Sequence, residues 1–243
     1  MTHLRSKKAL LALLLLLSGT KADGQVLIAL VFGEALNTGQ IEFGLDGGVN
    51  LASLGGIEHA EMLTTWNLGF YFDIKLADPS WMIHTGVIVK STMGTENAPL
   101  YPLGNGNLDA ALSGGKVAVN LQYFNVPIMV KHTFTGNVFL EGGVMLGLLY
   151  GATDEFINTV VEKDDLTYER NVRSEYHPLD AGIMIGAGYR LLSGNGMNLG
   201  VRYYYGLVDI YVDDLTPVRY NRSIYFTIGI PIGAANDSAG KKE

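Results

Sequence analysis

The feature that most constrains this chain is a two-residue alternation of apolar and polar side chains, repeated in eight segments beyond residue 40. Side chains two residues apart point to the same face of a β-strand, so each segment predicts a strand with one apolar and one polar face. In the fourth segment the apolar positions change parity near Tyr123 and Phe124, which predicts a β-bulge there. The expected strands cover residues 40–51, 64–76, 81–91, 116–134, 138–150, 177–191, 197–207 and 223–232.

The links between these strands alternate in length. Short links rich in Gly, Pro, Asp and Asn follow the second, fourth and sixth strands, and long links follow the others. This alternation places every short turn at one end of a closed sheet and every long loop at the other. The sequence therefore predicts an all-β fold, an eight-stranded antiparallel up-and-down transmembrane β-barrel with short periplasmic turns and long extracellular loops.

The same alternation also fits a soluble lipocalin-like barrel, in which the apolar faces point inward. Two features favour the membrane barrel. No Asp, Glu, Lys or Arg occupies an apolar position of an expected strand, as required where a midplane Lys or Arg costs about 2–4 kcal/mol. Aromatic side chains also stand near the strand ends, as in membrane-interface girdles. They are Trp66 and Tyr150 toward the long loops, and Trp81 and Tyr189 toward the short turns.

The polar faces carry few charged groups, and acids and bases balance. The acids are Glu42, Asp46, Asp73, Glu141 and Asp180; the bases are Lys75, Lys90, Lys131, Arg190 and Arg202; and His84 lies on the same side. We expect these side chains to form a paired network inside the barrel, because a buried charge is stable only beside a partner. The expected role of this network is structural.

The two ends of the chain differ from the barrel. A basic start, a short apolar run and a zone of small residues predict a secretory signal peptide. The apolar run falls well short of the ~20 residues that a spanning helix needs. The expected division is a signal peptide over residues 1–24, a lead-in segment over 25–39 that is compatible with a short helix, the barrel over 40–233, and a polar tail over 234–243.

Composition excludes several kinds of chemistry. Without cysteine the chain has no thiolate metal site and no cysteine nucleophile, and a net charge of −7 disfavours nucleic acid as a partner. The histidines, serines and glycine-rich stretches lack the spacing of a metal, hydrolase or nucleotide site. The acidic link over 151–176 predicts a solvated or lipopolysaccharide-facing loop, with a calcium site as the alternative. We therefore expect no enzyme activity, no cofactor and no metal.

Several strand segments resemble a known family. They are residues 40–50 (QIEFGLDGGVN), 123–134 (YFNVPIMVKHTF), 179–191 (LDAGIMIGAGYRL), 201–210 (VRYYYGLVDI) and 222–233 (RSIYFTIGIPIG). Over about residues 25–233 the chain is similar to the PorT-type outer-membrane β-barrel proteins of Bacteroidetes. The resemblance implies an eight-stranded barrel without catalytic residues, in a family with some members tied to protein export.

The expected function is therefore that of a non-enzymatic protein of the bacterial outer membrane. Its barrel would display loops for binding, or act as an accessory to envelope integrity or protein export. Its expected partners are outer-membrane lipid, lipopolysaccharide and other envelope or secretion proteins. Two alternatives are a small porin-like channel and a soluble lipocalin-like secreted binder of an apolar ligand.

Overall fold

The computed structural model describes residues 39–57, 60–191, 196–213 and 218–232. The expected signal peptide and polar tail, and the lead-in segment except for residue 39, lie outside these residues. The elements are β1 (Ile41–Gly55), β2 (Leu63–Lys75), β3 (Trp81–Ala98), α3 (Gly106–Ala111), β4 (Lys116–Thr133), β5 (Val138–Asn158), β6 (Leu166–Asn171), η1 (Arg173–Glu175), β7 (Leu179–Arg190), β8 (Asn198–Gly206) and β9 (Tyr220–Pro231).

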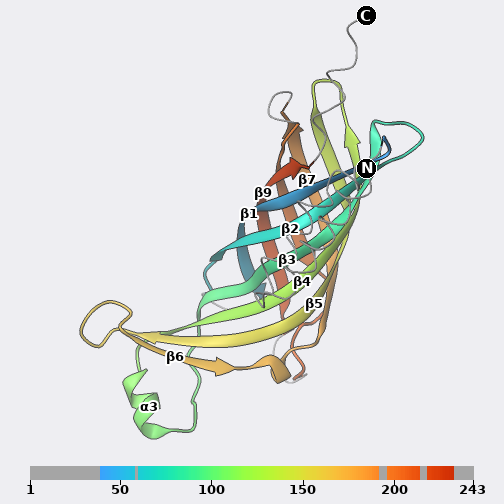
Figure 1. Ribbon diagram of the computed structural model, residues 1–243. Helices are drawn as coiled ribbons and strands as arrows, with labels where there is room; N and C mark the ends of the chain where they lie inside the picture. The colour runs from blue at the N-terminus through green and yellow to red at the C-terminus, as the bar shows by residue number, and fades with distance from the viewer. Residues whose placement is uncertain (1–38, 58–59, 192–195, 214–217, 233–243) are drawn as a thin grey trace, which may run out of the picture.

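Eight of these strands form a closed antiparallel barrel (Figure 1). Neighbours along the chain pair around the ring, except that β5 pairs with β7 because β6 binds only the far end of β5. Pairing between β1 and β9 closes the ring. The predicted fold class is confirmed. Short turns follow β2, β4 and β7 at the end where β1 begins and β9 finishes, and we call the opposite end the long-loop end.

Several strands run further into the long-loop end than expected. β1, β3 and β5 continue to Gly55, Ala98 and Asn158, well beyond their expected ends. The extension of β5 pairs with β6, in a link that was expected to be a loop, and the two strands reach outward near α3 (Figure 1). The inner side chains become apolar in this region, so the contrast between the two faces, and with it the sequence signal, is lost.

The predicted change of register near Tyr123 is confirmed, although the additional residue lies in the neighbouring strand. Gln122 of β4 pairs with Gly151, whereas Tyr123 pairs with Leu149, so Tyr150 is the extra residue in β5. β4 itself keeps its odd-numbered side chains inside along its whole length. Its apolar parity changes because the interior becomes apolar on the long-loop side of Tyr123.

A second bulge corrects the position expected for Lys90. Leu68 of β2 pairs with Lys90, and the next residue, Gly69, pairs with Ile88, which leaves Val89 as an extra residue in β3. An extra residue reverses the direction of the side chains that follow it. Lys90 therefore lies exposed on the outer wall rather than in the interior.

The outer wall is apolar, as expected for a barrel whose solvent is lipid. Exposed apolar side chains include Val130, Val138, Leu140, Val144, Leu146, Leu148, Ile183, Ile185, Val201, Phe226, Ile228 and Ile230. Within the described ranges, no helix is both long and apolar enough to span a membrane.

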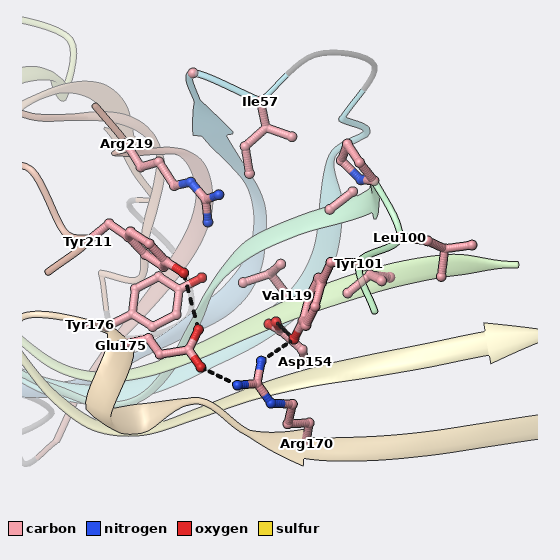
Figure 2. A pocket seen from close by; sticks show the side chains of 14 residues that line it. Ile57, Leu100, Tyr101, Val119, Asp154, Arg170, Glu175, Tyr176, Tyr211 and Arg219 are labelled. Carbon is pink, nitrogen blue, oxygen red and sulfur yellow. Dashed lines mark hydrogen bonds and ion pairs between the residues drawn. The ribbon is translucent and has the colours of Figure 1, made fainter. Parts of the chain in front are cut away.

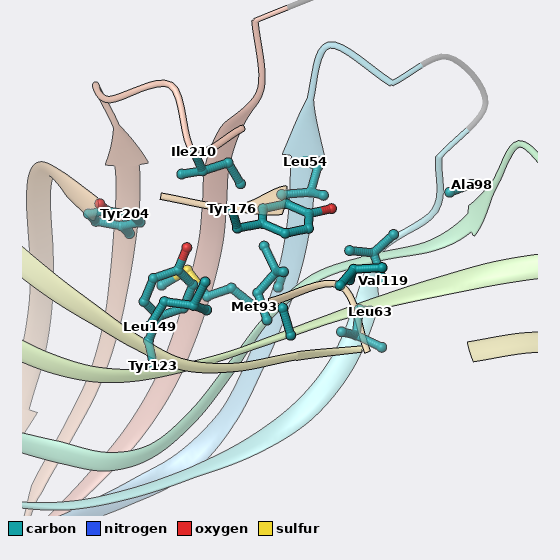
Figure 3. Close-up of a cluster of buried hydrophobic side chains, with 14 of the residues drawn as sticks. Leu54, Leu63, Met93, Ala98, Val119, Tyr123, Leu149, Tyr176, Tyr204 and Ile210 are labelled. Carbon is teal, nitrogen blue, oxygen red and sulfur yellow. The ribbon is translucent and has the colours of Figure 1, made fainter. Parts of the chain in front are cut away.

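The half of the lumen nearest the long loops is filled by apolar side chains from many strands (Figure 3). Met93, Leu121, Tyr123 and Leu149 point inward and are almost completely buried. Residues from the loops cover them, among them Ile210. This apolar cluster was not expected from the sequence. It closes the barrel on the long-loop side and supports the loops above it.

Candidate functional site

A charged cluster fills the other half of the lumen, and Arg202 of β8 is its centre. The Arg202 side chain is 6% exposed and contacts three other strands. Its Nε donates to Glu141 Oε1 at 2.5 Å, and its Nη1 donates to Asp46 Oδ2 at 2.6 Å. Its Nη2 lies 3.1 Å from His84 Nε2. A guanidinium nitrogen can only donate, so Nε2 accepts and the proton of a neutral His84 ring lies on Nδ1.

His84 extends this cluster toward β2 and β4. Its Nδ1 lies 2.6 Å from Asp73 Oδ1, and Lys131 Nζ donates to Asp73 Oδ2 at 2.8 Å. The Lys131 ammonium also lies 4.3 Å from the centroid of the Phe139 ring. Both oxygens of Asp73 are therefore used. The cluster ties six strands together across the axis of the barrel.

Two other expected groups form a pair at the short-turn mouth. Arg190 Nη2 donates to Glu42 Oε2 at 2.5 Å, and the Tyr71 hydroxyl donates to Glu42 Oε1 at 3.1 Å. The Arg190 side chain is 30% exposed and the Glu42 side chain 12% exposed. This pair is separate from the cluster around Arg202.

The remaining expected charges lie apart from both groups. Asp180 is buried under the apolar cluster and accepts a hydrogen bond from Asn221 Nδ2 at 2.8 Å. Lys75 is the exposed last residue of β2, and its Nζ donates to the Gly39 carbonyl at 3.2 Å. The exposed Lys90 lies with its Nζ 3.8 Å from the centroid of the Trp66 ring. Lys75 and Lys90 therefore do not join the expected interior network, Lys90 because of the bulge and Lys75 because its strand ends there.

The four expected interface aromatics, Trp66, Trp81, Tyr150 and Tyr189, are all exposed on the outer wall. Tyr150 stacks on Phe124 of β4 with ring centroids 4.5 Å apart. Tyr150 is also the extra residue at the bulge of β5.

A cavity of about 530 Å³ lies at the long-loop end, and we call it the loop-end pocket (Figure 2). All four long connections contribute to it. The connection after β1 supplies Ile57, and the one after β3 supplies Leu100 and Tyr101. The region after β5 supplies Arg170 and Glu175 with Asp154 of β5 itself, and the connection after β8 supplies Tyr211 and Arg219.

The polar side chains of this pocket form a continuous chain of hydrogen bonds. Tyr101 donates its hydroxyl hydrogen to Asp154 Oδ2 at 2.6 Å and accepts from Arg170 Nη1 at 2.8 Å. Arg170 Nη2 donates to Glu175 Oε1 at 2.6 Å. Glu175 Oε2 accepts from the Tyr211 hydroxyl at 3.1 Å. This chain joins loops that lie far apart in the sequence, so the pocket has a defined shape before any ligand enters.

Asp154 is the unusual member of this chain. Asp154 is only 5% exposed, and its Oδ1 has no hydrogen-bond partner among the described residues. Burial raises the pKa of Asp154 above its usual range, although the Tyr101 hydrogen bond and the nearby Arg170 and Arg219 act in the opposite direction. A buried acceptor without a donor costs free energy unless a water or a ligand supplies the hydrogen.

The sequence did not single out these pocket residues. The acidic link over 151–176 was expected to be solvated, yet Asp154, Arg170 and Glu175 turn into the pocket. A weak signal was present, because the bases of this link stand among its acids. The expected alternative of a calcium site finds no support in the described part of the chain, where no three His, Asp or Glu side chains are grouped to hold a metal ion.

A family model described as the outer membrane protein beta-barrel domain matches residues 34–212. No curated protein matches the chain.

Three solved structures are similar to the chain at low sequence identity. Ail, the attachment invasion locus protein of Yersinia pestis, is 11% identical over 79% of this chain and 99% of that chain, with a TM-score of 0.40. Neisserial surface protein A is 9% identical over 77% of this chain and 96% of that chain, with a TM-score of 0.38. The N-terminal β-barrel domain of Pseudomonas aeruginosa OprF is 13% identical over 79% of this chain and 100% of that chain, with a TM-score of 0.28.

Proposed function

We propose, from the premise that this chain belongs to the outer membrane protein beta-barrel domain family, that it is a closed, non-enzymatic barrel that binds a ligand in its loop-end pocket. The family and the ring of eight strands place the protein in the bacterial outer membrane. The long loops then face the cell exterior.

The observation that carries this proposal is the hydrogen-bonded chain from Asp154 to Tyr211. It uses side chains from three separate connections and leaves a cavity between them. A cavity with the unsatisfied Asp154 Oδ1 in its wall does not help loops to cover a barrel, whereas it suits a binding site. Small-molecule sites commonly have this form, with apolar walls and a few fixed polar groups.

The filled lumen supports a closed barrel rather than a porin-like channel. Side chains around Arg202 bridge the axis on one side, and the apolar cluster around Tyr123 occupies the other side. An eight-stranded ring leaves an interior that side chains just fill. The lipocalin-like alternative is wrong, because the apolar faces of the strands turn outward to the membrane.

Planar-bilayer recordings of the purified full-length protein test the closed barrel. We expect no stable single-channel steps from the wild-type protein. Regular steps of uniform amplitude would contradict the proposal and favour the channel. The Lys90→Ala variant should be equally silent, since Lys90 lies on the outer wall and its loss leaves the lumen intact.

We also propose the finer assignment to the PorT type, with lipopolysaccharide and other envelope or secretion proteins as neighbours. The support is the likeness of residues 179–191 and 222–233 to that group. Crosslinking in intact outer membranes, followed by mass spectrometry, tests this proposal. Repeated recovery of export components would support the accessory role, and recovery of lipid and unrelated abundant barrels alone would contradict it.

A further inference from the structure

We propose that the ligand of the loop-end pocket is an uncharged carbohydrate, held through Asp154 and Arg219. This inference rests on the proposed function and names the ligand class of that site.

The first observation is the free oxygen of Asp154. Oδ2 is used by Tyr101 at 2.6 Å, whereas Oδ1 is buried at the pocket wall without a donor among the described residues. A carboxylate oxygen can only accept, so the missing partner must carry an O–H or N–H hydrogen. A ligand hydroxyl group can supply this hydrogen.

The second observation is the charge of the lining. Arg170 and Arg219 stand against Asp154 and Glu175, so the described lining carries no net charge. Arg170 and Glu175 already neutralise one another at 2.6 Å. Charge complementarity governs which partners a site admits, and this site offers no excess of either sign. A neutral donor such as a hydroxyl group fits better than an ammonium or a phosphate.

The third observation is the mixture of aromatic and apolar surface beside these polar groups (Figure 2). Tyr101 and Tyr211 line the pocket together with Leu100, Val119 and Ile57. The Arg219 guanidinium lies over the Tyr211 ring, 4.3 Å from its centroid, so this donor group has a fixed place in the pocket wall. A sugar ring matches this arrangement, since it has hydroxyl groups around its rim and C–H groups on its faces.

The size and position of the pocket agree with this ligand. Its volume of about 530 Å³ lies within the ~300–1,000 Å³ of small-molecule pockets. The pocket lies at the end of the barrel that carries the long loops, where glycans outside the cell have access. We assign Asp154 Oδ1 as the acceptor of a sugar hydroxyl hydrogen and Arg219 as a donor to sugar oxygens.

Isothermal titration calorimetry tests this with the full-length protein in lauryldimethylamine oxide, a detergent without a sugar headgroup. The neutral probes are maltose, cellobiose, lactose and N,N′-diacetylchitobiose, and the comparison probes are glucose 6-phosphate, spermidine and triglycine. We expect at least one neutral disaccharide to bind. Asp154→Asn and Arg219→Gln should each weaken that binding by about tenfold or more.

The matched control is Glu155→Gln, which changes the next residue of β5 on the outer wall and should leave the affinity within about twofold. Unboiled gel mobility shows that each variant is folded. Failure of all neutral sugars to bind at millimolar concentration overturns the carbohydrate assignment. Binding of a charged probe alone, with the same loss in Asp154→Asn, also overturns it but keeps the pocket of the proposed function. Equal affinity of Asp154→Asn and the wild type overturns the site itself.

Discussion

At the scale of single residues, Arg202 shows how one side chain holds a barrel closed. Its guanidinium contacts Asp46, Glu141 and His84, which come from three different strands. We predict that Arg202→Ala lowers the free energy of unfolding by about 3–5 kcal/mol, because two carboxylates are left buried without a cation. Urea unfolding in lipid vesicles measures this change.

The control for Arg202 is Lys90→Ala, which removes an exposed base from the outer wall. Its cost should be below about 1 kcal/mol, as for other exposed charges. Equal stability of Arg202→Ala and the wild type would show that water, rather than protein, surrounds the Arg202 guanidinium.

For Asp154 we predict a substitution that raises stability, in contrast to the loss expected for Arg202→Ala. The pKa of Asp154 is raised in the folded protein by burial, whereas the unfolded chain has the ordinary value of about 3.9. The folded state therefore binds the proton more tightly, and stability is lost as the pH rises through the raised pKa. Asp154→Asn removes the buried charge and keeps an acceptor for Tyr101, so we expect a more stable long-loop end at neutral pH.

This gain should shrink at a pH below the raised pKa of Asp154, where the wild-type carboxyl is protonated. Thermal melting of both proteins across the acidic to neutral range tests the expectation. A constant difference between the two proteins at every pH would mean that Asp154 does not titrate. A residue that binds ligand while reducing stability is the expected trade-off at a functional site.

At the scale of elements, β6 and η1 are held by side chains as well as by the sheet. β6 has a single neighbouring strand, β5, and Arg170 of β6 reaches Tyr101 and Glu175. We predict that Tyr101→Phe speeds amide hydrogen exchange throughout β6 and η1, because the bridge between Asp154 and Arg170 is lost. Exchange in the membrane-spanning parts of β7 and β8 should not change.

Tyr168→Phe is the matched control for this variant. Tyr168 also lies in this region, on β6, but its side chain is exposed and outside the hydrogen-bonded chain of the pocket. Hydrogen exchange measured by mass spectrometry distinguishes the two variants. The same acceleration in both would show that β6 is held by its strand pairing alone.

At the scale of the whole molecule, the apolar outer wall sets the solvent of the barrel. Ile185 of β7 is 57% exposed on that wall. We predict that Ile185→Arg destabilises the barrel folded in a bilayer by about 2–4 kcal/mol, the cost of an Arg on the lipid-facing wall at the bilayer midplane. Val161→Arg, at an 84% exposed loop position, should be nearly neutral. Equal effects in vesicle folding experiments would contradict the membrane orientation of the wall.

Alternation along the chain was enough to predict the strands of the membrane-spanning part, their number in the ring and the outward direction of residues such as Leu146. A strand between lipid and a filled lumen has two chemically different faces, so neighbouring residues along it alternate between apolar and polar. The acid–base balance of the polar faces likewise predicted an interior of charges, and the structure brings Asp46, Glu141 and Arg202 together there.

Only the tertiary structure decided which charges meet and what the loops build. One extra residue at Val89 turns Lys90 outward. The local sequence does not reveal this bulge, because a single lysine is compatible with either face of the strand. The loop-end pocket joins Tyr101, Asp154 and Tyr211 across more than one hundred residues of chain. Such contacts depend on closure of the whole ring, which brings all four connections to the same end, and no local periodicity records that distance.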